Sequence, residues 1–524
     1  MVGGSDAHSG GGPRYSRGLR SGRATPAARP EDAGPAASGA APGSLRGAAV
    51  RGLGWTVLRT VSSRLVGSLV FIVLARLLDP AAFGTVALAS VFVVLLSLLV
   101  ESGFGEALVQ RTTVTARDLD TGFWANTAMG VGLAGLLAGA APLIAAPFHQ
   151  PDLGAVLQAL SPALVLAGLS SVPQALLRRE LAFRQLALRG VTATVAGGVV
   201  GVGMALAGFG VWSLVGQALV NALVGAVVLW LGCSWRPGRD VSRATFGELS
   251  RFGANVLGER VALFTSRRSD DLLIGLVLGS VALGLYTAAY RILLLLTETL
   301  IWTVEAVAFP LFSRLQGDVQ RTRRAFYTVT QLCSAVAVPA FLTLAVLAPE
   351  LTRLVLGPKW EDAIPVMRVL ALVGLPHAIT YVNKALVTAA GRPNLSLRVA
   401  LLTGAVNLLG FVLVVHWGVL AVAISYVVCG YLLAPVSVWS VSRVLPIQPR
   451  PYLRLFVAPL TSGLVMLLSL VGAKAALDRA LTGLTLIAVL LIVAGGVYLL
   501  ALYITDRRLV LSAVTNGRRL ARSS

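Results

Sequence analysis

The chain is organised as apolar stretches of about 20 residues that recur along most of its length. A helix of this length crosses a hydrocarbon core about 30 Å thick, because an α-helix rises about 1.5 Å per residue. Of the 524 residues, 56% are hydrophobic and 13% are charged, whereas a soluble domain carries about 25% charged residues. The sequence therefore predicts an all-α membrane protein. About fourteen transmembrane helices are expected, at residues 54–77, 83–108, 121–146, 153–176, 187–208, 211–232, 252–278, 282–310, 326–347, 362–390, 394–415, 418–441, 453–474 and 481–504.

The segments between these stretches alternate in their arginine content. Arginines occur in every second segment, whereas the segments around DPAAF, PFHQPD, AGFG, GSVALG and VVHWG carry none. The basic exceptions in this second set are Arg353, Lys359, Lys474 and Arg479. The positive-inside rule assigns the arginine-rich set to the cytoplasm. Both termini are then cytoplasmic, as an even number of spans requires, and the expected location is the inner (cytoplasmic) membrane.

The net charge of +21 does not indicate a nucleic-acid partner. Its arginines lie in short segments between apolar stretches and are not interleaved with aromatic residues. The three cysteines lie in separate apolar stretches and the four histidines are isolated, so neither a disulfide framework nor a metal site is expected. Residues 1–52, rich in Gly, Ala, Ser, Pro and Arg, predict a disordered cytoplasmic tail, and residues 506–524 a basic cytoplasmic tail.

The two halves of the chain repeat each other at a shift of about 200 residues. ARLLDPAAFGTVALA at 75–89 aligns with GLVLGSVALGLYTAA at 275–289, which matches Gly84 with Gly284. Because each repeat has an even number of spans, the halves share one orientation and are related by a pseudo-twofold axis along the membrane normal. The expected domains are an N-lobe of spans 1–6 (53–235), a C-lobe of spans 7–12 (236–445), and the two C-terminal spans 13 and 14 (446–505).

Charged residues also occur inside the expected spans. FTSRRSDDLLIG, residues 264–275, places four charges within five positions of the seventh span. A charged side chain at the bilayer centre costs roughly 2.5–3.5 kcal/mol, so it normally faces a bundle interior or water. We expect the charges of spans one, seven and eight, with Lys384 of span ten, to line a water-filled cavity between the lobes. The cationic candidates are Arg59, Arg64, Arg260, Arg267, Arg268, Arg291 and Lys384.

The arginines among these candidates outnumber the carboxylates at the same depth, so the cavity is expected to be net positive. Guanidinium binds phosphate through two parallel hydrogen bonds, which favours an anionic substrate. No carboxylate lies within four residues of Arg59 or Arg64, which favours a functional role for both. Glu101, Glu106 and Glu259 are instead expected at the membrane interface.

Ion pairing is a structural alternative for the other charges. Arg267 and Asp271 are four residues apart and can pair on one helix. Arg268 can pair with Glu298 or Glu305 of the next span. In that case these side chains hold helices together and do not contact a substrate.

Three stretches carry a resemblance to a known family. They are LARLLDPAAFGTVALA (74–89) after an arginine-bearing first span, LLRRELAFRQLALR (176–189), and DDLLIGLVLGSVALGLYTAAYRI (270–292). With the fourteen expected spans, they resemble the polysaccharide-transport (Wzx-like oligosaccharide) flippases of the multidrug/oligosaccharidyl-lipid/polysaccharide exporter superfamily, over about residues 52–445. The resemblance implies that an undecaprenyl-diphosphate-linked oligosaccharide is moved to the outer leaflet by alternating access. The product would be a surface polysaccharide: O-antigen, capsule or exopolysaccharide.

The same resemblance implies roles for particular residues. In related lipid II flippases, arginines of the first and eighth helices engage the diphosphate, and Arg59, Arg64 and Arg291 are the matching candidates. Arg64→Ala is accordingly expected to abolish export while membrane insertion stays normal. Apart from Na⁺ or H⁺ coupling, no cofactor is expected, and membrane lipids, a polysaccharide polymerase and export machinery are the expected partners. The candidate ion carriers are Asp270, Asp271, Glu298 and Glu305.

Three alternative functions remain open at this stage. A cation-coupled multidrug exporter of the same superfamily would favour an acidic or aromatic cavity, against the arginine excess. A polysaccharide polymerase or ligase would need a large outer loop with catalytic groups, whereas the longest outer segment, about 348–361, is short. A passive scaffold has little reason to retain interior charges. A transporter, and not an enzyme, is therefore the leading hypothesis.

Overall fold

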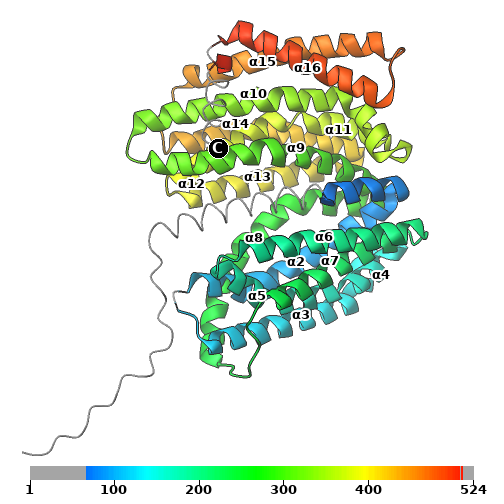
Figure 1. Ribbon diagram of the computed structural model, residues 1–524, viewed down its shortest axis with the longest axis vertical. Helices are drawn as coiled ribbons and strands as arrows, with labels where there is room; N and C mark the ends of the chain where they lie inside the picture. The colour runs from blue at the N-terminus through cyan, green and yellow to red at the C-terminus, as the bar shows by residue number, and fades with distance from the viewer. Residues whose placement is uncertain (1–65, 112, 508, 512–524) are drawn as a thin grey trace, which may run out of the picture. The chain divides into compact units, whose positions relative to one another are not determined.

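The structure, a computed structural model, describes residues 66–111, 113–507 and 509–511 (Figure 1). These residues form α-helices with a few short turns of other helix types and no strand, which confirms the all-α class. The expected tail 1–52 and residues 512–524 lie outside the described residues. A first helical segment, Val66–Leu77, is followed by α2 (Pro80–Gln110), α3 (Ala116–Ala145), α4 (Pro151–Leu160), α5 (Pro162–Arg179), α6 (Phe183–Leu206), α7 (Val211–Gly232), α8 (Arg243–Val277), α9 (Gly279–Arg314), α10 (Val319–Leu351), α11 (Ala363–Ala371), α12 (Gly374–Ala389), α13 (Pro393–Val414), α14 (Val419–Ser442), α15 (Pro449–Leu477) and α16 (Gly483–Thr505).

Local sequence explains where several helices begin. Thr115 and Asp118 form a capping box at the start of α3, in which each side chain accepts a hydrogen bond from the other residue's backbone N–H. A proline stands in the first turn of α4, α5, α13 and α15, where its missing N–H costs no helical hydrogen bond. Gly279, with φ of +83°, makes the tight connection between α8 and α9, because glycine adopts this conformation without strain.

The number of membrane spans differs from the expected fourteen. Eleven of the described helical segments are long and apolar enough to cross a membrane, or twelve if α11 and α12, bent by 46°, form one span. The structure describes the expected first span only from Val66. The described helix, Val66–Leu77, is therefore too short to be counted as a span. The expected seventh span corresponds to α8, which has 35 residues but is too rich in charged residues to count by hydropathy. The count of fourteen is therefore not confirmed.

The crossing of α2 with α9 shows the relation between the two halves. A Cβ atom built on Gly84 would overlap the carbonyl oxygen of Ser280, and one built on Gly284 would overlap the carbonyl oxygen of Pro80. Residues 80 and 84 correspond to 280 and 284 under the sequence repeat. The contact is therefore reciprocal, as a twofold axis requires. Glycine is needed at both positions because the two backbones touch.

A second set of contacts joins the halves at the predicted outer end of the helices. The Trp360 indole N–H donates to the carbonyl oxygen of Ala75 at 2.8 Å. Lys359 pairs with Asp79 at 2.9 Å. Arg76 donates from Nε to a backbone carbonyl of the π-helical turn Thr352–Leu356, at 3.1 Å. These bonds hold the segment between residues 75 and 79 against the loop that follows α10.

The last two helices pack beside the second half. α15 and α16 contact each other and α10, and Figure 1 draws them as a layer next to α10. Their outward side chains are strongly apolar, as are those of other helices: Ile504 is 75% exposed and Leu413 is 74% exposed. Such exposure suits side chains that contact lipid, because a bilayer interior is as apolar as leucine itself.

Candidate functional site

The start of α8 is fixed to the helices of the first half. In the loop before α8, the backbone N–H groups of Gly238 and Asp240 donate to the Asp120 carboxylate at 2.9 and 3.3 Å. The Ser242 N–H donates to the Thr121 hydroxyl at 3.1 Å, and the Ser242 hydroxyl caps α8. These bonds hold the beginning of α8 against the predicted cytoplasmic end of α3.

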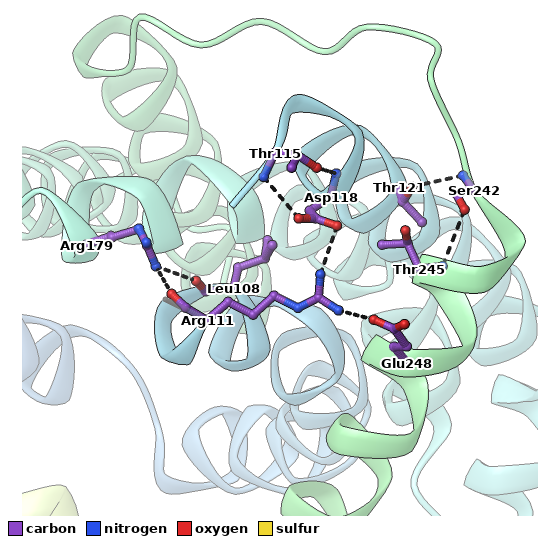
Figure 2. A network of polar contacts seen from close by, with 9 residues as sticks. All are labelled: Leu108, Arg111, Thr115, Asp118, Thr121, Arg179, Ser242, Thr245 and Glu248. Carbon is purple, nitrogen blue, oxygen red and sulfur yellow. Dashed lines mark hydrogen bonds and ion pairs between the residues drawn. The ribbon is translucent and has the colours of Figure 1, made fainter. Parts of the chain in front are cut away.

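An arginine at the end of α2 extends this junction (Figure 2). Arg111 pairs with Asp118 of α3 at 2.9 Å and also with Glu248 of α8. Arg179, at the end of α5, donates to the carbonyl oxygens of Leu108 and Arg111. Four helices of the chain therefore meet around Arg111.

A polar cavity of about 320 Å³ lies between helices of the first half and the middle of α8, and we call it the N-terminal cavity. Three arginines and one glutamate line it, together with short hydroxyl and amide side chains. Its charged and polar lining residues are Ser97 and Glu101 of α2, Ser170, Ser171, Gln174 and Arg178 of α5, Arg189 of α6, Asn221 of α7 and Arg260 of α8.

Hydrogen bonds hold several of these side chains in place. Arg189 donates from Nη1 to the Gln174 amide oxygen at 2.6 Å. The side-chain amide of Asn126 on α3, which does not itself line the cavity, donates to the Ser171 hydroxyl at 2.6 Å. A Cβ atom on Gly105 would lie 3.1 Å from that hydroxyl, so glycine lets α2 pack close to α5. The N-terminal cavity is therefore a preorganised cationic surface.

A second cavity, of about 470 Å³, lies among helices of the second half, and we call it the C-terminal cavity. Most of its lining residues belong to α12, α13 and α14, and a few belong to α8 and α9. One aspartate and one lysine are its acidic and basic lining residues. Its aromatic, histidine and charged lining residues are Asp270, Tyr290, His377, Tyr381, Lys384, Phe411 and Tyr426.

Hydroxyl groups connect the wall of the C-terminal cavity. The Tyr426 hydroxyl lies 3.1 Å from His377 Nε2 and 3.4 Å from the Tyr290 hydroxyl. The buried Asp270 carboxylate accepts from the Tyr286 hydroxyl and from the backbone N–H of Asp271, both at 2.9 Å. The end of α8 is thus bonded to α9, as its start is bonded to α2 and α3.

Two predicted cations lie on the exposed parts of α8 and α9. Arg268 pairs with Asp271 at 2.7 Å, with the arginine half-exposed and the aspartate buried. Arg291 is exposed, and its guanidinium carbon lies 4.6 Å from the centre of the Phe71 ring, a cation–π contact across the two halves.

An apolar groove of about 640 Å³ begins beside Arg291. It is lined by α9, α10, α15 and α16, and Ile292, Leu295 and Leu296 of α9 form one wall. Arg291 and Leu295 are four residues apart, about 40° around the helix, and so share one face. A cation therefore stands at the border of a long apolar surface.

The predicted site residues do not all line one cavity in the described part of the chain. Arg260 lines the N-terminal cavity, whereas Asp270 and Lys384 line the C-terminal cavity. Asp271 is buried in its pair with Arg268, and Glu298 is partly buried on α9. Arg59 and Arg64 lie outside the described residues, as do the side chains of Arg267 and Glu305. Among the described residues, no three His, Cys, Asp or Glu side chains are grouped as a metal site.

Sequence reasoning missed several lining residues. Arg178 stands next to a span boundary, so the positive-inside rule accounted for it as a cytoplasmic loop residue. The signal that singles out Arg189 is its position inside the expected span 187–208. The cluster of Tyr290, His377 and Tyr426 had no sequence signal, since its members come from three separate helices.

The chain matches a family model described as polysaccharide biosynthesis protein over residues 73–365, more than half its length. It is 27% identical over 361 residues to the lipopolysaccharide biosynthesis protein WzxC of Escherichia coli (strain K12), which covers 68% of this chain and 73% of the relative. It is 31% identical over 323 residues to the succinoglycan biosynthesis transport protein ExoT of Rhizobium meliloti (strain 1021), 62% of this chain and 65% of the relative.

Two solved structures share the fold. One is the lipid II flippase MurJ in an inward closed conformation, with a TM-score of 0.70 and 13% identity, covering 87% of this chain and 99% of that one. The other is a multidrug resistance MATE family transporter in an inward-facing conformation, with a TM-score of 0.59 and 16% identity, covering 74% and 98%. The fold, the match over residues 73–365 and the named relatives agree with the resemblance that the sequence carries: the chain belongs to the polysaccharide biosynthesis protein family.

Proposed function

We propose that the protein is a flippase that moves an undecaprenyl-diphosphate-linked oligosaccharide from the cytoplasmic to the outer leaflet by alternating access. The transported unit would serve the assembly of a surface polysaccharide. No bond is made or broken in this process, so the protein is a transporter and not an enzyme. The names of WzxC, ExoT and the teichuronic acid biosynthesis protein TuaB of Bacillus subtilis (strain 168), which is 26% identical over 348 residues, support this function.

The observation that carries the proposal is the position of Arg291 beside the apolar groove. Arg291 lies twelve residues after Gly279, the first residue of α9, and therefore about 18 Å along the helix. An exposed cation at that depth is costly in lipid. A lipid diphosphate removes the cost, because its anionic head pairs with the guanidinium while its polyprenyl chain lies along the apolar groove.

The remaining expectations extend the same proposal. The protein would lie in the inner (cytoplasmic) membrane with both termini in the cytoplasm, near a polysaccharide polymerase and export machinery. Na⁺ or H⁺ coupling would use Asp270, whose carboxylate is buried at the wall of the C-terminal cavity. Arg59 and Arg64 stay candidate ligands of the diphosphate.

A matched pair of variants tests the role of Arg291. Arg291→Gln removes the cation next to the apolar groove. Arg443→Gln is the control, because Arg443 also stacks on an aromatic ring, 4.9 Å from the centre of Trp439, but is not adjacent in the chain to any residue that lines the groove. The rate of translocation is measured in proteoliposomes that report the leaflet of a fluorescent polyprenyl-diphosphate oligosaccharide.

Arg291→Gln is expected to slow translocation by about 10- to 100-fold, since a hydrogen bond to a charged group contributes about 1.5–3 kcal/mol. Arg443→Gln is expected to keep the wild-type rate. Wild-type translocation by folded Arg291→Gln would refute the proposed function of the groove and its arginine.

A further inference from the structure

A second apolar groove lies between α5 and α7 of the first half, and we call it the α5–α7 groove. Its volume is about 400 Å³, within the usual range for a ligand site. Leucine, alanine and valine side chains of both helices line it, together with Trp230 in the last turn of α7. Arg236, in the loop after α7, is the charged residue of this lining. The groove therefore joins an apolar surface to one cation.

The groove is open to the surroundings of the helix bundle. Leu223, Val227 and Leu231 of α7 line it and are all exposed, Leu231 by 80%. Their spacing of four residues places them on one face of α7. Leu223 and Leu231 are about 12 Å apart along the helix. Half of a hydrocarbon core about 30 Å thick is about 15 Å, so the groove spans most of one leaflet.

Aromatic side chains surround the end of the groove next to the loop. Trp230 and Trp235 stack with 6.2 Å between their ring centroids, and Phe123 of α3 packs edge-on against each of them at 5.7 Å. The Trp124 indole N–H donates to the carbonyl oxygen of Gly238 at 2.8 Å. Tryptophan is enriched where the hydrocarbon meets the lipid headgroups. This end is therefore placed at headgroup level, on the predicted cytoplasmic side.

The Arg236 guanidinium is held in position at the same end. Its Nη1 donates to the carbonyl oxygens of Cys233 and Trp235 at 2.6 and 2.8 Å. Its carbon lies 5.8 Å from the centre of the Trp230 ring. A guanidinium has five N–H donors, and Nε and Nη2 carry the three that Nη1 does not. A neighbouring pair of such donors suits two oxygens of one phosphate.

We infer that the α5–α7 groove binds an anionic phospholipid of the cytoplasmic leaflet, with its phosphate on Arg236 and one acyl chain between α5 and α7. The acidic residue of the loop, Asp240, pairs with Arg117 at 2.9 Å and so does not neutralise Arg236. A zwitterionic lipid fits less well, because its own cation offsets its phosphate. Leu166 lines both this groove and the N-terminal cavity, so the bound lipid would lie against the wall of that cavity.

The occupant is a lipid of the membrane and not the transported lipid. The groove beside Arg291, which the proposed function assigns to the polyprenyl chain, is lined by α9, α10, α15 and α16. The α5–α7 groove shares no lining residue with it in the described part of the chain. The two grooves therefore serve separate lipids.

Lipid binding by the purified full-length protein tests this site. Delipidated protein in detergent is titrated with dioleoyl phosphatidylglycerol and with dioleoyl phosphatidylcholine, a zwitterionic probe with the same chains. Native mass spectrometry gives the dissociation constant of each lipid. Undecaprenyl phosphate is added as a competitor in a third titration, because it carries the substrate's type of chain.

Two variants alter the groove, and each has a matched control. Arg236→Gln removes the cation, and Arg239→Gln removes a cation of the same loop that does not line the groove. Val227→Trp fills the groove, and Val199→Trp adds the same bulk on the exposed face of α6. Val227→Trp leaves the carbonyl bonds of Arg236 in place, so it tests the groove even if Arg236→Gln disturbs the loop. A thermal unfolding midpoint checks the fold of all four.

The wild type is expected to bind phosphatidylglycerol about fivefold or more tightly than phosphatidylcholine, as the attraction of one interfacial arginine predicts. Arg236→Gln should abolish this preference, and Arg239→Gln should keep it. Val227→Trp should weaken both lipids by about tenfold, because the acyl chain loses its apolar contacts. Val199→Trp should bind both lipids as the wild type does.

Equal affinity of the wild type for the two phospholipids would overturn the inference. Equal losses in Arg236→Gln and Arg239→Gln would also overturn it, since they would indicate a general attraction to the basic loop. Wild-type binding by Val227→Trp would place the lipid elsewhere on the molecule. Displacement of phosphatidylglycerol by an equal concentration of undecaprenyl phosphate would make the transported lipid the occupant, against the inference.

Discussion

The N-terminal and C-terminal cavities lie among corresponding helices of the two halves, and α8 reaches both, but they are lined by different chemistry. The first is walled by α2, α5, α6 and α7, and the second by their counterparts in the repeat, α9, α12, α13 and α14. The first has three arginines, one glutamate and no aromatic side chain among its lining residues in the described part of the chain. The second has tyrosines, a histidine, one aspartate and one lysine.

This difference shows that corresponding helices can carry side chains of different chemistry in the two halves. The cationic lining of the first suits an anionic cargo. The hydrogen-bonded tyrosines and the buried Asp270 of the second suit the proposed ion coupling. A duplicated bundle can separate cargo binding from energy coupling in this way without any change of backbone architecture.

Charge reversal in each cavity gives the largest expected contrast. Arg260→Glu removes the positive excess of the N-terminal cavity and is expected to weaken the affinity for a polyprenyl-diphosphate oligosaccharide lipid by about 100-fold, because a charge-assisted hydrogen bond is replaced by repulsion. Lys384→Glu changes the C-terminal cavity by the same formal charge and is expected to leave the affinity for this lipid unchanged. Equal losses of affinity would show that the two cavities do not divide these roles.

Neutralising the carboxylate of each cavity sharpens the same contrast. Asp270→Asn is expected to reduce translocation under an imposed Na⁺ or H⁺ gradient to the rate without a gradient, because the proposed ion carrier is removed. Glu101→Gln should keep the response to the gradient. The measurement is the ratio of rates with and without the gradient, and an unchanged ratio in Asp270→Asn would argue against its role in coupling.

The shared scaffold predicts equal effects at the two crossing glycines. Gly84→Ala and Gly284→Ala each force a methyl group into a backbone carbonyl, and each is expected to lower the free energy of unfolding by about 1–3 kcal/mol. Gly203→Ala in α6 is the control, since a Cβ there meets no atom within 4 Å, and it should be neutral or stabilising by up to about 1 kcal/mol. Thermal unfolding in detergent measures all three, and clearly unequal losses at 84 and 284 would contradict the reciprocal contact.

The smallest expected effect concerns the tyrosine cluster. Tyr426→Phe removes the hydroxyl that lies 3.1 Å from His377 Nε2, and it is expected to cost about 1 kcal/mol of stability, the usual contribution of one hydrogen bond. Affinity for the polyprenyl-diphosphate oligosaccharide lipid should not change, since this bond belongs to the C-terminal cavity. A change in that affinity would mean that the two cavities are not independent.

Much of the fold could be predicted from the sequence because hydropathy and helix geometry are local properties. The expected span 211–232 coincides with α7, Val211–Gly232, and the repeat matches Gly84 with Gly284, the two residues at the crossing of α2 with α9. The seventh span also corresponds to a continuous helix, although its charges make it too polar for a hydropathy criterion.

The sites were harder to predict because they depend on contacts between distant segments. Arg291 was singled out from its depth, but its apolar groove is formed partly by α15 and α16, about two hundred residues later in the chain. For Asp271, a pair with Arg267 on the same helix is an alternative that the sequence leaves open, and the structure shows a pair with Arg268. Spacing on one helix allows both pairs, so spacing alone does not identify the partner.

The continuous helix α8 lines both cavities, with Arg260 in the first and with Leu263 and Asp270 in the second. Arg260 and Asp270 are ten positions and about 15 Å apart along the helix. Its two ends are anchored in opposite halves, by Glu248 to Arg111 and by Asp270 to Tyr286. A turn or tilt of this single rod displaces both side chains together. Binding of cargo in the N-terminal cavity would therefore shift Asp270 in the C-terminal cavity through movement of α8 itself. No chain of intermediate contacts is needed.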